Sequence, residues 1–258
     1  FFAPRTPGFA APAGELPPLI VTMHGGPTAH HATDLHLAKQ FFTTRGFAVV
    51  DVNYGGSSGF GRAYRERLRG QWGVVDLADA VAAVRYLAAA GRVDPKRIVI
   101  RGGSAGGYTV LCALAFTDVF AAGINYFGIA DLEMLAADTH KFESRYTDGL
   151  IAPLPQGRET YRARSPIHHL QRLDAALITF QGAEDKAVPP EQSRAIVEAV
   201  RARGRPVAYL EFDGEQHGFR RAGNITRALQ AEVYFLGRVL GFTPAGPVEP
   251  VAIDNLPA

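Results

Sequence analysis

The sequence predicts an α/β protein in which helices cover both faces of a mostly parallel, doubly wound β-sheet. Short apolar runs alternate with segments of helical periodicity along almost the whole chain, which is typical of parallel sheets with crossover helices. Glycine-rich or polar segments follow several of these runs, at the strand ends where ligands bind in such sheets. The length of 258 residues fits one such domain, or at most two small ones.

The individual elements follow from the spacing of apolar residues. Strands are predicted over residues 19–23, 47–52, 97–100, 122–127, 175–180 and 207–212. Helices are predicted over residues 35–44, 76–90, 108–116, 191–203 and 225–240. Residues 131–161 are polar and interrupted by Pro and Gly, so we expect short helices packed over one edge of the sheet.

Both ends of the chain are rich in proline and lie outside the predicted alternation. We expect residues 1–18 to be a surface connector and residues 243–258 an extended tail, with one catalytic-type domain across residues 1–258. The sequence begins at Phe1 without a methionine, which predicts a processed product or a fragment of a longer protein.

Composition argues against several classes of protein. The net charge is +2 and no block of basic residues occurs, so the electrostatic pattern of a nucleic-acid-binding protein is missing. No run of 18 apolar residues occurs, so no membrane-spanning helix is predicted. The single cysteine, Cys112, lies in an apolar run and favours a reducing compartment, so we expect a cytoplasmic protein.

The segment Gly102-Gly103-Ser104-Ala105-Gly106 lies between a predicted strand and a predicted helix. It fits G-x-S-x-G, the nucleophile elbow of α/β-hydrolases, in which a sharp turn presents a serine and requires small neighbours. A phosphate-binding loop would need G-x-G-x-x-G or a Gly-Lys-Ser/Thr ending, and neither is present. The motif therefore predicts the α/β-hydrolase fold with Ser104 as nucleophile.

Two further residues complete a predicted catalytic triad. Asp185 and His217 each follow a different predicted strand, giving the chain order Ser, Asp, His. A serine hydroxyl needs an adjacent base, which His217 can supply, and the imidazole needs a carboxylate such as Asp185 to orient it. The acids that compete with Asp185 for this role are Glu184, Asp174, Asp213 and Glu215. Glu184 would point differently, Asp174 precedes its strand, and the other two are expected to be solvated loop charges.

Further motifs resemble the catalytic domain of the prolyl oligopeptidase family, including its acylaminoacyl-peptidase and dipeptidyl-peptidase-like members. They are His24-Gly25-Gly26-Pro27, residues 53–61, residues 102–108, Ser165-Pro166, residues 181–189 and Gly218 after His217. They run in the family's order from about residue 16 to residue 242. The resemblance implies a cofactor-independent serine peptidase that cleaves short or acylated peptides through an acyl-enzyme, with Ser104, Asp185 and His217 as its triad.

The resemblance also implies an oxyanion hole made by the Tyr54 hydroxyl and the backbone N–H of Ala105. A fixed O–H and a fixed N–H can both meet the charge that develops on a carbonyl oxygen. The chain departs from the family in two respects. Gly55 stands where many relatives carry arginine after this tyrosine, and the β-propeller that precedes the hydrolase domain in relatives is absent from the sequence.

The substrate pocket is expected to be apolar, with Tyr108, Tyr126 and Phe127 around the nucleophile. No acidic residue occurs in the elbow or at the end of the adjacent strand, so a preference for Lys or Arg is not predicted. Two other functions are compatible with the scaffold: a carboxylesterase acting on small esters, and a non-catalytic binding module. The His-Gly-Gly-Pro and Asn-Tyr segments count against the esterase, and the intact Ser, Asp and His count against the binding module.

The remaining histidines do not predict a metal site. His30, His31, Asp34 and His36 are close in sequence, but their spacing does not bring three ligands to one side of a regular element. We therefore predict no metal and no cofactor, and we expect His24 to serve the turn at the end of its strand.

Overall fold

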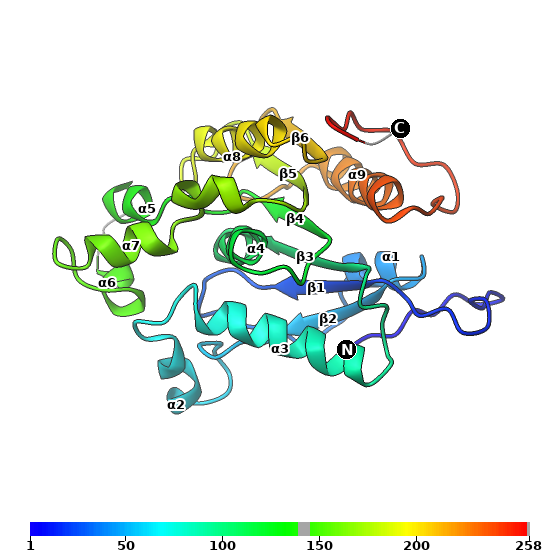
Figure 1. Cartoon of the computed structure of the whole chain (residues 1–258), viewed down its shortest axis with the longest axis horizontal. Coiled ribbons are helices and arrows are strands. Elements are labelled where there is room, and N and C mark those ends of the chain that lie inside the picture. The colour runs from blue at the N-terminus through cyan, green and yellow to red at the C-terminus, as the bar shows by residue number, and fades with distance from the viewer. Residues whose placement is uncertain (139–144, 257–258) are drawn as a thin grey trace.

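The computed structural model describes residues 1–138 and 145–256. Within this part of the chain, six strands form one sheet with the order β2-β1-β3-β4-β5-β6, and every neighbouring pair is parallel (Figure 1). The strands are β1 (Leu19–Met23), β2 (Ala48–Val52), β3 (Ile98–Gly103), β4 (Ala122–Tyr126), β5 (Ala176–Gly182) and β6 (Val207–Phe212). The predicted doubly wound α/β fold is confirmed.

Helices cover both faces of the sheet, as the sequence predicts. The helices that cover the two faces are α1 (Leu37–Thr43), α3 (Val75–Ala89), α4 (Ala105–Phe116), α8 (Pro190–Ala202) and α9 (Ala222–Leu240). Alternate side chains of β1 enter two separate cores, because successive residues of a strand point to opposite faces. Leu19 and Val21 pack in the core beneath α3, α4 and α8, whereas Ile20 packs in the core beneath α1 and α9.

Short elements gather at the end of the sheet toward which the strands point (Figure 1). They are α2 (Arg62–Arg65), η1 (Glu66–Leu68), α5 (Leu132–Asp138), α6 (Tyr146–Leu150), α7 (Arg158–Arg164) and η2 (Pro166–Arg172). The helices α5, α6 and α7 confirm the short helices expected around residues 131–161, of which residues 139–144 lie outside the described residues. The sequence did not predict α2 and η1.

The two terminal segments pair with the two edge strands. Phe2 forms an antiparallel bridge with Val49 of β2, and Asp254 forms one with Val207 of β6. The connector and the tail thus satisfy part of the backbone that an open sheet edge would otherwise expose. None of the described helices is both long and apolar enough to cross a membrane.

Candidate active site

Ser104 lies in a strained turn between β3 and α4. Its backbone dihedrals are φ 56° and ψ −122°, outside the regions that a non-glycine residue ordinarily adopts. The Ser104 N–H donates to the Tyr126 carbonyl oxygen at 3.0 Å, which ties the turn to the neighbouring strand β4. The structure thus forms the sharp strand-to-helix turn that the G-x-S-x-G pattern predicts.

Small residues on both sides of Ser104 allow this turn to close. A Cβ atom on Gly102 would lie 2.5 Å from the backbone of Gly106. A Cβ atom on Gly106 would lie 2.2 Å from the carbonyl oxygen of Met23 in β1. Both distances are far below van der Waals contact, so these positions exclude any side chain.

Hydrogen bonds connect Ser104, His217 and Asp185 in one line. His217 Nε2 lies 2.8 Å from Ser104 Oγ, and His217 Nδ1 lies 2.8 Å from Asp185 Oδ2. The three residues follow three different strands, β3, β6 and β5, whose carboxyl ends meet at one edge of the sheet. The arrangement is that of a nucleophile, a base and the carboxylate that orients the base.

Asp185 is held by backbone donors of its own loop. Its Oδ1 accepts hydrogen bonds from the N–H groups of Ala187 and Val188, both at 2.9 Å. This leaves Oδ2 to face His217, and the Asp185 side chain is fully shielded from solvent. Both oxygens of this buried carboxylate therefore have hydrogen-bond partners, and Oδ2 is placed to accept from the His217 ring.

The competing acids are engaged elsewhere or exposed. Glu184 is exposed, and Asp174 pairs with Arg203 at 2.6 Å beyond the opposite end of β5. Glu215 is buried and not the solvated loop charge that the sequence suggested: it accepts from the N–H groups of Arg220 and Arg221, both at 2.9 Å. Glu215 therefore closes the loop that carries His217.

The Tyr54 hydroxyl, which the sequence predicts beside the Ala105 N–H, makes its hydrogen bonds to backbone carbonyls of the His24–Pro27 turn. It lies 2.8 Å from the Pro27 carbonyl oxygen and 3.1 Å from the His24 carbonyl oxygen, and the side chain is fully buried. Burial raises the pKa of Tyr54 far above its ordinary value, so the phenol keeps its single proton for these acceptors. Tyr54 therefore supports the turn formed by His24–Pro27 through two of its backbone carbonyls.

His24 holds the same turn from within. Its Nδ1 lies 2.8 Å from the Gly25 carbonyl oxygen, its Nε2 lies 2.7 Å from Ser57 Oγ, and its ring stacks on Tyr54 at 4.2 Å. Burial lowers the pKa of His24 to about 4, so the ring is neutral near pH 7. The Gly25 carbonyl oxygen can only accept, so this contact is made by Nδ1–H as donor. Ser57 Oγ lies between His24 Nε2 and the Tyr54 carbonyl oxygen, to which it donates at 2.8 Å.

The contact between His24 and the Gly25 carbonyl fixes the direction of the Gly26 N–H. The Gly25–Gly26 peptide is trans, so the Gly26 N–H points opposite to the Gly25 carbonyl that His24 holds. The turn lies against the nucleophile: a Cβ atom on Gly25 would be 3.7 Å from Ser104 Cβ. The Ala105 N–H is the first of α4 and has no acceptor within its own helix.

Two of the expected pocket residues point away from the site. Tyr108 is fully buried, packs on Trp72 with ring centroids 4.7 Å apart, and donates its hydroxyl to the Arg164 carbonyl oxygen at 3.0 Å. The expectation that Tyr108 lines the substrate pocket is wrong, because its side chain belongs to the core around α4. The Tyr126 hydroxyl bonds to Glu232 of α9, on the opposite side of the sheet from α4.

Phe127 is the expected pocket residue that lies beside the triad. Its ring centroid is 4.8 Å from that of His217, and it also lies 5.6 Å from Phe219. Phe127 is partly exposed and has a positive φ of 39°, which is strained for an aromatic residue. The backbone thus turns this ring from the end of β4 toward His217.

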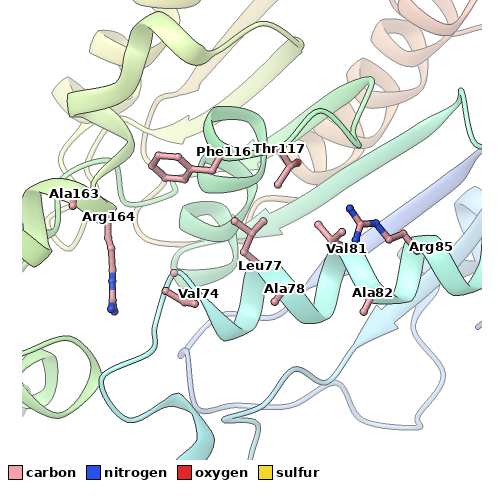
Figure 2. Close-up of a pocket in the computed structure, with 11 residues that line it drawn as sticks. Val74, Leu77, Ala78, Val81, Ala82, Arg85, Phe116, Thr117, Ala163 and Arg164 are labelled. Atoms are coloured by element: carbon pink, nitrogen blue, oxygen red, sulfur yellow. The ribbon is translucent and has the colours of Figure 1, made fainter.

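An apolar groove elsewhere on the molecule is separate from the triad. It lies between α3, the end of α4 and the end of α7, where Leu77, Val81 and Phe116 line it (Figure 2). Ser104, Asp185 and His217 do not line it. In residues 1–138 and 145–256, no three His, Cys, Asp or Glu side chains gather as a metal site would require.

Comparisons with known proteins agree on one family. The sequence model of the prolyl oligopeptidase family, Peptidase_S9, matches residues 33–243. Dipeptidyl aminopeptidase BIII of Pseudoxanthomonas mexicana is 32% identical over 243 residues, which cover 92% of this chain and 35% of that protein.

Solved structures show the same likeness. A puromycin-hydrolyzing peptidase of Mycobacterium tuberculosis is 53% identical with a TM-score of 0.95, covering 98% of this chain and 38% of that one. The acylaminoacyl peptidase of Pyrococcus horikoshii is 26% identical with a TM-score of 0.83, covering 95% of this chain and 40% of that one. The chain thus spans well under half the length of the relatives it matches.

Proposed function

The chain belongs to the prolyl oligopeptidase family of serine peptidases, and we propose that it is a catalytic domain that cleaves amide bonds through an acyl-enzyme on Ser104. The observation that carries this proposal is the line of 2.8 Å contacts from Asp185 through His217 to Ser104 at a strained elbow. A serine that merely packed in a turn would need neither the strain nor the two partners.

The reaction follows from the positions of these side chains. Ser104 Oγ attacks the carbonyl carbon of the scissile amide while His217 Nε2 takes the hydroxyl proton. The tetrahedral intermediate expels the amine, which receives that proton from His217, and an ester remains on Ser104. Water then attacks the ester, with His217 taking its proton and returning it to Ser104. Asp185 keeps Nδ1 protonated and stabilises the ring while it is charged.

We propose the backbone N–H groups of Ala105 and Gly26 as the donors of the oxyanion hole. An N–H after the nucleophile and an N–H from the loop of a neighbouring strand are the pair that α/β-hydrolases use. Support comes from the place of the turn against Ser104 and from the His24 contact that directs the Gly26 N–H. In this proposal Tyr54 positions the turn and does not touch the oxyanion.

The substrates we propose are short peptides or N-acylated peptides with an apolar residue before the scissile bond. Phe127, beside His217, supplies an aromatic surface at that point. Because a similar protein is named a puromycin-hydrolyzing peptidase, puromycin belongs in the first set of compounds to test. We also propose that a propeller domain accompanies this domain in the whole protein, and that the protein is cytoplasmic, consistent with its single buried cysteine.

The test is active-site labelling joined to a substrate panel. A fluorophosphonate should label the protein once, at Ser104, and Ser104→Ala should abolish labelling and turnover together. The panel contains p-nitroanilides with apolar or basic residues, matched p-nitrophenyl esters, and puromycin. Cleavage of the apolar amides supports the peptidase, whereas ester cleavage without any amide cleavage would establish a carboxylesterase. Labelling that persists in Ser104→Ala would remove Ser104 from the mechanism.

A further inference from the structure

Gln181 lies beside Asp185 in the interior, and the triad itself gives this side chain no role. We propose that Gln181 is a positioning residue that fixes the rotation of the Asp185 carboxylate and thereby the direction of His217. The inference rests on the proposed function of the triad. It concerns a side chain that would touch neither substrate nor reacting atoms.

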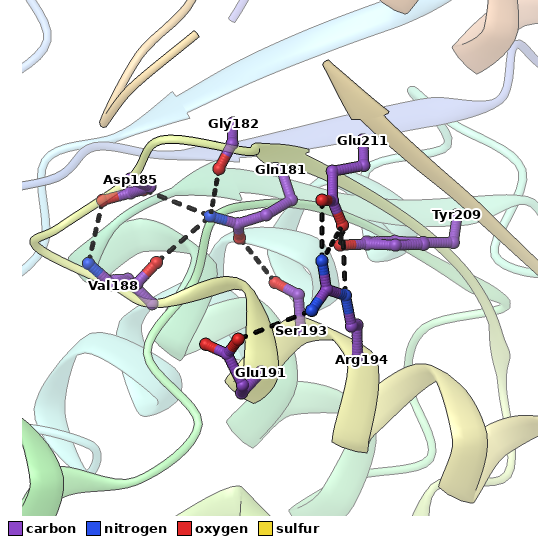
Figure 3. Close-up of polar contacts among 9 residues, drawn as sticks. All are labelled: Gln181, Gly182, Asp185, Val188, Glu191, Ser193, Arg194, Tyr209 and Glu211. Atoms are coloured by element: carbon purple, nitrogen blue, oxygen red, sulfur yellow. Dashed lines mark hydrogen bonds and ion pairs between the residues drawn. The ribbon is translucent and has the colours of Figure 1, made fainter. Parts of the chain in front are cut away.

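The Gln181 amide spans the loop that carries Asp185. Gln181 is the last residue but one of β5 and is fully buried. Its Nε2 lies 3.3 Å from Asp185 Oδ2, 3.1 Å from the Val188 carbonyl oxygen and 3.2 Å from the Gly182 carbonyl oxygen (Figure 3). The two hydrogens of this amide nitrogen are thus shared among acceptors at the beginning (Gly182), the middle (Asp185) and the end (Val188) of the loop.

The orientation of this amide is set by its partners. The three atoms around Nε2 are all acceptors, so the amide nitrogen and not its oxygen must face them. On the other side, Oε1 accepts from the Ser193 hydroxyl at 2.7 Å, and Ser193 is also buried on the first turn of α8. A flipped amide would place an oxygen against three oxygens, so the hydrogen bonds admit one orientation.

This amide completes the donors around the carboxylate. Oδ1 of Asp185 accepts from two backbone N–H groups, and Oδ2 accepts from His217 and from Gln181. Without Gln181, Oδ2 would keep His217 as its contact, and the carboxylate could rotate within a loop joined by fewer bonds. Because His217 takes its direction from Oδ2, the loss would reach Ser104 through the ring.

Three variants test the proposal in the full 258-residue chain. Gln181→Leu removes the donor at similar volume, and we expect kcat to fall about 10-fold, the usual size for a hydrogen bond to a charged group, with KM unchanged. Gln181→Glu keeps the shape but makes the function of residue 181 depend on pH. Arg194→Gln is the matched control on α8, since Arg194 is exposed and pairs with Glu211 at 2.7 Å, away from the loop (Figure 3).

The pH dependence of Gln181→Glu separates positioning from packing. At low pH a protonated Glu would donate to Asp185 Oδ2 as the amide does, whereas at higher pH two facing carboxylates repel or share one proton. We therefore expect the ratio of its kcat/KM to that of the native protein to fall as pH rises. Other ionisable side chains of this loop, Glu184 and Lys186, are exposed, and His217 is common to both proteins.

Each result supports or overturns the proposal. Native kcat in a folded Gln181→Leu, or a ratio for Gln181→Glu that does not change with pH, would overturn it. If Gln181→Leu does not fold, the pH ratio decides. If the native protein cleaves no substrate, the proposed function fails, but the rate of fluorophosphonate labelling of Ser104 still compares native and variant proteins and tests the inference separately.

Discussion

His217 contacts Ser104 and His24 lies in the turn after β1, and their surroundings give these two histidines different chemistry. His217 is partly exposed and faces the carboxylate of Asp185, so a charged ring formed there has a partner. The contacts of His24 are a carbonyl, a hydroxyl and a phenol ring, and burial lowers its pKa to about 4. The first ring is suited to moving a proton, and the second to holding backbone in place.

If His24 directs the Gly26 N–H, His24→Ala should cost catalysis and not substrate binding. We expect kcat to fall roughly 10²–10³-fold, the usual loss when one oxyanion donor is removed, with a small change in KM. Steady-state kinetics on an apolar p-nitroanilide measure both quantities. Affinity for a peptide boronate, which forms a tetrahedral adduct, should fall with kcat, whereas affinity for a product peptide should not.

Tyr54→Phe distinguishes the two possible roles of the phenol. As a support of the turn, Tyr54 should lose less than about 10-fold in kcat on removal of the hydroxyl, since His24 still holds Gly25. A fall as large as that for His24→Ala would instead make the hydroxyl a direct oxyanion donor, as the sequence suggested.

At the residue scale, the sequence predicted which side chains follow strands but not where each one points. The meeting of Ser104, Asp185 and His217 could be predicted because short loops after parallel strands share one edge of the sheet. Tyr108 was misplaced, and the hydroxyl partners of Tyr54 were not foreseen, because a phenol is large enough to reach several acceptors and tertiary packing chooses among them. Gln181 lies in the motif of residues 181–189, but its role could not be predicted from the sequence, since its partners are known only when the loop is folded.

At the scale of elements, buried strands were the most predictable because their side chains repeat an apolar pattern. The boundary between β3 and α4 was missed by several residues: the strand runs to Gly103 and the helix begins at Ala105. Glycine and alanine carry no side-chain pattern from which to place this turn. The helix α2 was missed because its four residues are not buried and show no apolar stripe.

At the junction of β1, β3 and α4, the close approach of Gly106 to Met23 predicts that Gly106 cannot be replaced without loss. In Gly106→Ala the new Cβ would meet backbone atoms of Met23 and His24, which cannot move without shifting β1 and its turn. We expect a loss of about 1–3 kcal/mol in the free energy of unfolding, the usual cost of overpacking, and a loss of activity. Thermal or urea unfolding followed by circular dichroism measures the change.

Gly223→Ala is the control for that substitution. Gly223 lies in the first turn of α9, and a Cβ atom there would have nothing within 4 Å. Alanine is the better helix former, so this variant should be neutral or slightly more stable and fully active. Equal losses for the two variants would show that the close approach at Gly106 is not what limits the elbow.

At the scale of the whole molecule, the sheet separates two cores and brings the triad together at its carboxyl edge. The core beneath α3, α4 and α8 supports the elbow from one face, and the core beneath α1 and α9 supports the strands from the other. Terminal segments pair with both edge strands. The site is therefore built on strand ends, while short helices and loops lie at the same end of the sheet (Figure 1).

Size selection of substrates belongs to this scale, because the chain spans 35–40% of the length of the relatives named above. If a propeller restricts access in the longer protein, the domain alone should cleave a long unstructured polypeptide about as well as a short peptide with the same cleaved bond. We expect the two kcat/KM values to agree within about 10-fold, or about 1.4 kcal/mol in barrier height. Mass spectrometry of products from matched short and long substrates measures both values.

A longer protein with the proposed propeller domain supplies the comparison for this result. The longer protein should cleave the short peptide at a rate similar to the rate measured with the domain alone. It should cleave the long polypeptide far more slowly than the domain alone does. If the domain alone rejects the long polypeptide, size selection would lie in the short elements at the carboxyl end of the strands, α2, α5, α6 and α7, and not in a propeller. Equal cleavage of both substrates by both forms would show that neither part selects by size, because access to Ser104 would then be open in the whole protein.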